Sequence, residues 1–154
     1  MNLADYPDEL LRGISNKNEQ FITPEGYPTQ AAFKFDDYNP DREDDFCELS
    51  INWVDDEGAV DVLLNQINPR KNLPQFQGGY CRFPRVFLHT MRAYFDNGHL
   101  TYERRPIEAD DTNGVTANKY HGNILMKKDL SKQAITNIQV TLAGLAGAVI
   151  PRDN

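Results

Sequence analysis

The segment Phe46–Trp53 reads F-C-E-L-S-I-N-W and alternates apolar and polar residues along its length. Such alternation with a period of two is typical of a β-strand that packs one face against a core. The apolar face would carry Cys47, Leu49, Ile51 and Trp53, and the polar face would carry Glu48, Ser50 and Asn52. We place the rest of the chain around this strand.

Segments on either side of this strand predict a mixture of helices and strands. Before it, we expect a short helix over Pro7–Ile14, with Leu10, Leu11 and Ile14 as its apolar face, and a strand over Ala31–Phe35. After it, acids at 55–57 favour a helix start, and Asn68-Pro69 ends that helix after Ile67. We further expect a loop over 71–79, strands at Tyr80–Phe83, His99–Arg104 and Tyr120–Met126, and a polar, turn-rich stretch over 108–119.

The stretch that follows Pro84 has two readings. Proline suits the first position of a helix, and Asn97-Gly98 suits its end, so we favour a helix over Arg85–Tyr94. The alternative is a strand over Val86–Phe95 that closes on a hairpin turn at 96–98.

A C-terminal helix is indicated by one apolar stripe at 3-4-3-4 spacing. Asp129 or Ser131 can cap this helix, and Pro151 marks its end. Small residues at 144 and 147 flank the stripe, so the helix over 135–149 either packs closely inside the domain or joins two copies of the chain. The stripe consists of Ile135, Ile138, Leu142, Leu145 and Val149.

These elements predict the fold class. The 154 residues are 40% hydrophobic and 25% charged, which is ordinary for one globular domain. We expect residues 1–154 to form a single two-layer α+β domain. It would contain a mostly antiparallel sheet of about five strands and two or three packed helices, including the C-terminal one.

Charge is distributed unevenly along the chain. Residues 1–61 contain sixteen acidic and four basic side chains, a balance of −12, whereas residues 62–154 have a balance of +5. The net charge of −7 argues against general binding of nucleic acid, because such binding depends on neutralising phosphates. The N-terminal sequence has no basic and apolar leader, and no segment predicts a membrane span, so we expect a cytoplasmic protein.

The negative charge gathers in two places. Six of the ten residues in Asp36–Asp45 are acidic, and three more acids follow at 55–57. An exposed loop of this kind speeds encounter with a basic partner, and Tyr38 or Trp53 would then serve as the apolar anchor. The predicted partner-binding residues are Asp36, Asp37, Asp41, Glu43, Asp44, Asp45, Asp55 and Asp56.

The positive charge gathers between residues 82 and 105, among several aromatic residues. Guanidinium groups bind carboxylates and phosphates in a fork, and aromatic rings can stack on a ligand. These arginines either pair with the acidic segments of their own chain or bind an acidic protein or a nucleotide. The predicted anion-binding set is Arg82, Arg85, Arg92, Arg104 and Arg105.

One histidine stands out as a candidate for chemistry. His121 precedes Gly122, which permits a close backbone approach, and the polar face of Phe46–Trp53 becomes a candidate site if His121 lies beside it. Glu48 and Asp61 are its candidate acidic companions. The sequence contains no metal-binding or cofactor-binding motif, and we expect Cys47 and Cys81 to be reduced core thiols.

Two hypotheses for function follow. The leading one is a protein-binding module that docks electrostatically on a basic partner, such as an immunity protein, an antitoxin-like inhibitor or an accessory subunit of a bacterial defence system. Catalysis plays no part in it. The alternative is a small hydrolase or nuclease that uses His121 with Glu48 and holds an anionic substrate with the arginine cluster.

Overall fold

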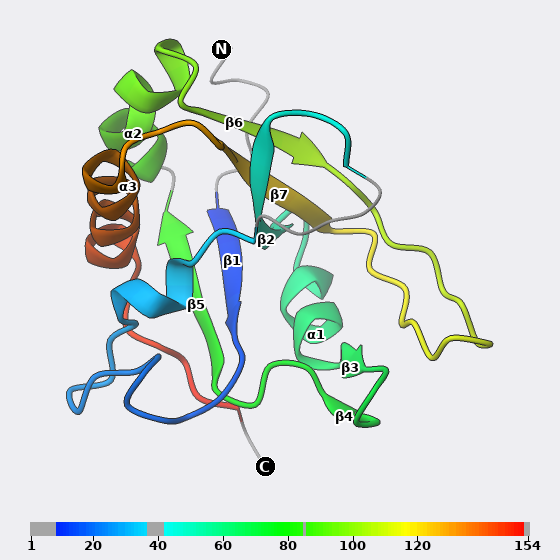
Figure 1. Cartoon of the computed structure of the whole chain (residues 1–154). Coiled ribbons are helices and arrows are strands. Elements are labelled where there is room, and N and C mark those ends of the chain that lie inside the picture. The colour runs from blue at the N-terminus through cyan, green and yellow to red at the C-terminus, as the bar shows by residue number, and fades with distance from the viewer. Residues whose placement is uncertain (1–8, 37–41, 85, 153–154) are drawn as a thin grey trace.

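The structure is a computed structural model, and it describes residues 9–36, 42–84 and 86–152. Figure 1 shows a central sheet with helices on both sides. Five strands form this sheet in the order β5-β1-β2-β7-β6, and every neighbouring pair is antiparallel. They are β1 (Glu9–Ile14), β2 (Phe46–Trp53), β5 (Gly79–Pro84), β6 (Leu100–Arg104) and β7 (His121–Lys127). The sheet and its helices confirm the predicted α+β class.

Residues 46–53 form a strand, as their alternating pattern predicted, and this strand is the middle one of the sheet. It pairs with β7 along its length, from Phe46 opposite Lys127 to Asn52 opposite His121. Leu49, Ile51 and Trp53 are at most 2% exposed and belong to the larger core cluster. The side chains of the opposite face differ in exposure: Glu48 is half-buried, Ser50 is exposed and Asn52 is buried.

Two helices cover one face of the sheet, and a third covers part of the other face (Figure 1). Helices α2 (Val86–Asp96) and α3 (Lys132–Leu145) bury Met91, Ile138 and Leu142 in the larger core. Helix α1 (Gly58–Leu64) places Ala59 and Leu63 in a second, smaller core cluster. The apolar face of the sheet thus has two helices, and a smaller layer lies across from it.

The first predicted helix is wrong, because residues 9–14 form β1 between β5 and β2. A central strand is covered on both sides, so its apolar residues need not alternate with polar ones. Leu10 packs in the larger core and Leu11 in the smaller one. The two neighbouring leucines, which resembled part of a helix face, instead point to opposite sides of the sheet.

The predicted strand over Ala31–Phe35 is also wrong. The chain forms a short 3-10 helix, η2 (Gln30–Phe33), and buries Ala32 and Phe33 beneath α3. Among the described residues from 30 to 36, the strand pairing is one bridge, between Asp36 and Glu48.

Two other predicted boundaries move. Helix α1 ends at Leu64 rather than Ile67, because the chain turns there into a hairpin of β3 (Ile67–Asn68) and β4 (Leu73–Pro74), the latter within the predicted loop. Helix α3 begins after Ser131, whose side chain accepts a hydrogen bond from the Ala134 amide at 3.1 Å, and it stops before Val149. The predicted helix over Arg85–Tyr94, rather than the alternative strand, is confirmed by α2.

Gly122 allows the backbone of β7 to lie close to Glu103 and Trp53. A Cβ atom at this position would overlap the Glu103 carbonyl oxygen and the Trp53 indole nitrogen, and it would lie 2.9 Å from Trp53 Cδ1. The backbone next to His121 can therefore approach Trp53 because residue 122 has no side chain.

We predict that Gly122→Ala lowers the free energy of unfolding by about 1–3 kcal/mol, because neither the backbone carbonyl nor the buried indole has room to move. The matched control is Gly144→Ala in α3, where an added Cβ meets no atom within 4 Å. That change should leave stability unaltered or raise it by up to about 1 kcal/mol. The free energies of unfolding of both variants are measured by urea denaturation. Equal changes in the two variants would contradict the close approach at residue 122.

Candidate functional site

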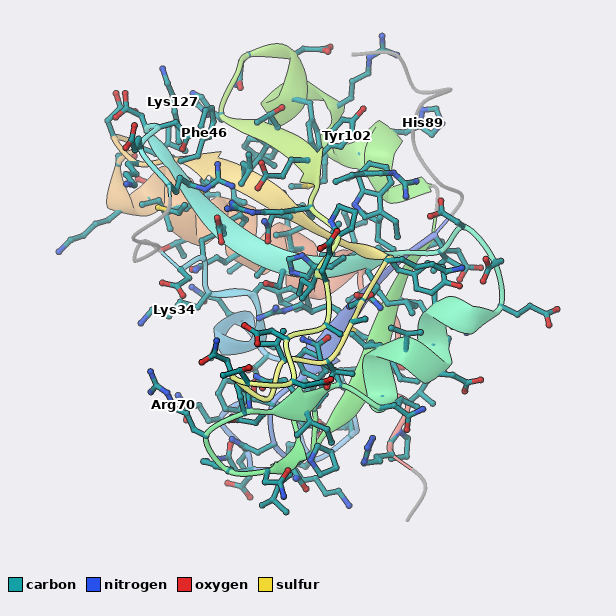
Figure 2. All side chains as sticks on the ribbon, turned by 90° about the vertical axis from the view of Figure 1, so that its right-hand side faces the viewer. Lys34, Phe46, Arg70, His89, Tyr102 and Lys127 are labelled. Atoms are coloured by element: carbon teal, nitrogen blue, oxygen red, sulfur yellow. The ribbon has the colours of Figure 1, made fainter. Side chains whose placement is uncertain are left out.

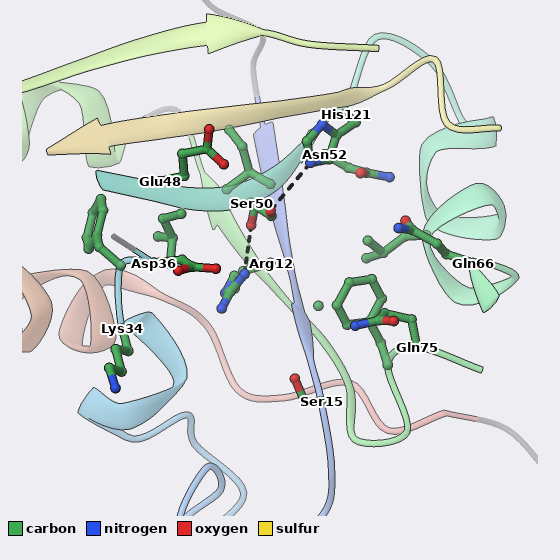
Figure 3. A pocket seen from close by; sticks show the side chains of 16 residues that line it. Arg12, Ser15, Lys34, Asp36, Glu48, Ser50, Asn52, Gln66, Gln75 and His121 are labelled. Atoms are coloured by element: carbon green, nitrogen blue, oxygen red, sulfur yellow. Dashed lines mark hydrogen bonds between the residues drawn. The ribbon is translucent and has the colours of Figure 1, made fainter. Parts of the chain in front are cut away.

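A pocket of about 460 Å³ opens on the side of the sheet that α1 partly covers. Its wall on the sheet comes from β1 and from the polar face of β2, and Figure 3 shows these side chains converging on it. Helix α1, the segment after η2 and the residues around β4 complete the pocket. The polar residues in its lining include Arg12, Ser15, Lys34, Asp36, Glu48, Ser50, Asn52, Gln66, Gln75 and His121.

His121 and Ser50 meet at the mouth of this pocket. Because β2 and β7 pair with Asn52 opposite His121 and Ser50 opposite Asn123, the imidazole of His121 reaches back toward Ser50. Its Nδ1 lies 2.8 Å from the Arg105 carbonyl oxygen, and its Nε2 lies 3.4 Å from Ser50 Oγ. The condition that makes the polar face of β2 a candidate site is therefore met.

The hydrogen bonds also determine the tautomer of His121. A carbonyl oxygen only accepts, so Nδ1 must carry the proton that it donates to Arg105. In the neutral ring, Nε2 is then the basic nitrogen and faces the Ser50 hydroxyl. Burial lowers the pKa of His121 below its ordinary value of 6.5, against smaller opposing effects from the Arg105 carbonyl and the charge of Glu48. The neutral form therefore dominates at pH 7.

A buried network of amide groups holds the end of β2 beside His121. Asn118 donates to the side-chain oxygen of Asn52 at 2.8 Å and to that of Gln66 at 3.2 Å. Asn52 in turn donates to the Ala59 carbonyl at 3.1 Å, which ties β2 to the start of α1. Because Asn52 and Gln66 also line the pocket, this network keeps polar side chains in a defined arrangement there.

Glu48 lines the same pocket but is not bonded to His121. Arg42 donates to its Oε1 at 2.6 Å, and Arg105 approaches the same oxygen at 3.4 Å. Arg42 also pairs with Asp44 at 2.8 Å and with Glu103, and its side chain is only 6% exposed. Glu48 therefore acts on His121 through its charge, and the hydrogen-bonded partner of the histidine is Ser50.

The predicted anion-binding arginines pair with the protein's own acids. Arg104 binds both carboxylate oxygens of Asp55, each at 2.6 Å, with its guanidinium 4.1 Å from the Trp53 ring centroid. Hydrogen bonding by Arg104 is the main reason that the pKa of Asp55 lies below its usual value. The remaining pairs are Arg82 with Glu9 at 2.5 Å, Arg92 with Asp96 at 3.4 Å and Arg105 with Glu48; Arg85 lies outside the described residues.

The predicted docking acids differ in their surroundings. Glu43, Asp44 and Asp45 are exposed, while Asp56 accepts hydrogen bonds from the Tyr120 hydroxyl at 2.5 Å and from the Gly58 amide at 2.8 Å. Asp36 is exposed and exchanges two backbone hydrogen bonds with Glu48. Of the remaining predicted residues, Asp37, Asp41 and Tyr38 lie outside the described residues, and Trp53 is a core residue. Docking on a basic partner stays a prediction.

Both cysteines are buried, and neither forms a disulfide. Burial raises the pKa of Cys81 to about 12, so its thiol remains protonated and is a poor nucleophile at neutral pH. In the part of the chain that the structure describes, no group of histidine, cysteine, aspartate and glutamate side chains is arranged to hold a metal ion. None of the described helices has the length and apolar character needed to cross a membrane.

Comparison with known proteins gives no match among family models, curated proteins or solved structures.

Sequence reasoning missed Arg12 as a pocket residue. It lies in the segment that we predicted to be a helix, and no motif surrounds it. Only the pairing of β1 with β2 brings its guanidinium to Ser50. By contrast, Ser50 could be found from the alternating pattern of β2 once His121 was placed on the neighbouring strand.

We predict that the His121 imidazole titrates with a midpoint below 6.5, because burial disfavours its charged form. The measurement is an NMR titration of its ring protons. The variant His121→Gln lacks these protons and so assigns their signals. A midpoint above 6.5 would show that charged groups around the ring outweigh its burial, and a midpoint above 7 would contradict a neutral base at pH 7.

Proposed function

We propose that the protein is a small hydrolase in which Ser50 is the nucleophile and His121 is its general base. One observation carries the proposal: the unprotonated Nε2 of His121 faces the Ser50 hydroxyl at 3.4 Å at the mouth of a pocket. The distance is long for a hydrogen bond, and such pairs commonly tighten when substrate binds. The proposal keeps the predicted role of His121 and adds Ser50 as the nucleophile, whereas the sequence predicted only Glu48 as the acid-base partner of the histidine.

The chemistry proceeds by acyl transfer. As Ser50 Oγ attacks the carbonyl carbon of an ester or thioester, its proton passes to His121 Nε2. The tetrahedral intermediate collapses when the imidazolium returns that proton to the leaving group, which leaves an acyl-serine. Water then attacks the acyl-serine with the same histidine as base, which releases the acid and restores Ser50.

Three features of the surroundings support these roles. The Arg105 carbonyl orients the imidazole and fixes its tautomer, which is the task of the third member in a catalytic triad. Glu48 favours the imidazolium that forms during the reaction, because its negative charge raises the pKa of His121. The volume of about 460 Å³ lies within the range of small-molecule sites, so a small acyl donor fits better than a polymer.

We predict that a fluorophosphonate probe labels wild-type protein at Ser50, which mass spectrometry of the digested protein would detect. Ser50→Ala should abolish the labelling, and His121→Ala should slow it about 100-fold or more, because the general base is lost. The labelling rate of wild type should rise with pH through a midpoint below 6.5, since only neutral His121 accepts the proton.

The matched control is Ser15→Ala, because Ser15 lines the same pocket but has no histidine beside it. This variant should react at the wild-type rate. The hydrolase proposal fails if wild-type protein is not labelled, or if the label resides on another residue and survives in Ser50→Ala.

A further inference from the structure

Arg12 is a pocket residue whose hydrogen-bonding capacity is only partly used. Its Nε donates to the Ala32 carbonyl at 3.0 Å, and its Nη1 donates to the Ser50 carbonyl at 2.9 Å. A guanidinium has five N–H groups. Three of these N–H groups therefore make no hydrogen bond to the described residues, although the side chain lines a pocket and points toward Ser50 (Figure 3).

Arg12 also has no acidic partner among the described residues. This sets it apart from Arg42, which pairs with three acids, and from Arg104, which is clamped to Asp55. Burial lowers the pKa of Arg12 to about 10, so the group still carries its positive charge at neutral pH. A partly buried charge that has no acidic partner among the described residues is costly, and an anion entering the pocket would relieve that cost.

The other charged side chains that line the pocket are compatible with an anion bound to Arg12. Lys34 lies at the rim, where it is exposed and makes no hydrogen bond or ion pair with the described residues. Figure 2, which views the molecule from the side of α1, shows its side chain projecting outward. Of the two carboxylates in the lining, Glu48 is balanced by Arg42 and Arg105, and Asp36 is exposed at the rim.

We propose that Arg12 forms an oxyanion-binding subsite in the pocket, with Lys34 as a second cation at its entrance. The group bound is a carboxylate or a phosphate, because both accept several hydrogen bonds from one guanidinium. Arg12 is anchored to the carbonyl of Ser50, so the bound anion lies beside the proposed nucleophile. As a statement about substrate, this rests on the proposed hydrolase, whose acyl donor would then carry a negative charge.

The test is a titration of wild-type protein with inorganic phosphate and, separately, with acetate, followed through the NMR signals of the arginine side chains. The Arg12 Nε–H signal should shift in a saturable manner with at least one anion. Phosphate alone, acetate alone or both would support the subsite and show which headgroup it prefers. An Arg12 signal that moves with neither anion overturns the proposal, and this arm needs no variant.

Variants supply the second arm. Arg12→Gln should weaken the binding about tenfold or more, because a charged hydrogen-bonding group is lost. Arg92→Gln is the matched control, since this exposed arginine on α2 pairs with Asp96 and lies outside the pocket lining. If a folded Arg12→Gln protein binds as tightly as Arg92→Gln, the subsite proposal is wrong.

The two proposals can fail separately. Ser50→Ala should bind the anion as wild type does, because Arg12 contacts only the backbone of that residue. Anion binding by a protein that the serine probe does not label would retain the subsite and refute the hydrolase. If the probe labels Ser50 but the Arg12 signal shifts with neither anion, the hydrolase is retained and the subsite is refuted.

Discussion

The pairing of β2 with β7 is the constraint on which the site depends. Seven residue pairs connect these strands, and a shift by one residue would turn every side chain of β7 to the opposite face. With the observed register, His121 lies opposite Asn52, so its ring reaches Ser50 and its Nδ1 reaches the Arg105 carbonyl. Gly122 permits this pairing to lie close against Trp53, and α1 then closes the pocket over the polar face of β2.

Charge plays a different part from the one that its uneven distribution suggests. The acidic first part of the chain and the basic second part meet in the folded protein. Among the described residues, three pairs join a base of the second part to an acid of the first part: Arg82 with Glu9, Arg104 with Asp55 and Arg105 with Glu48. Exposed pairs of this kind contribute at most about 1 kcal/mol each, because water screens them. They orient side chains around the site more than they stabilise the fold, whereas Arg12 remains without an acidic partner among the described residues.

Much of the fold could be predicted from local patterns. The alternation in Phe46–Trp53 and the stripe that includes Ile138 and Leu142 both reflect burial of one face, which a sequence records directly. Strand β1 could not be predicted in this way. It is buried on both faces, so its apolar residues do not alternate, and the preference for a strand comes from its two neighbours.

The candidate site was predictable only in part. His121 and the polar face of β2 were recognisable, but their meeting depends on a strand register that no local pattern contains. Arg12 could not be found at all, because its importance comes from the absence of a nearby acid among the described residues, and that absence exists only in the folded chain. The ion pairs of the predicted arginine cluster could not be read from the sequence either. The acidic partners of its described members lie on distant segments or one helical turn away.

The central claim is that His121 presents a basic Nε2 to Ser50, and the tautomer of the imidazole tests it most directly. Long-range ¹H–¹⁵N correlation spectra at pH 7 distinguish the two ring nitrogens by their chemical shifts. The structure predicts a neutral ring with its proton on Nδ1, because that nitrogen donates to the Arg105 carbonyl. A ring protonated on Nε2, or on both nitrogens, would leave no base for Ser50 and would contradict the account.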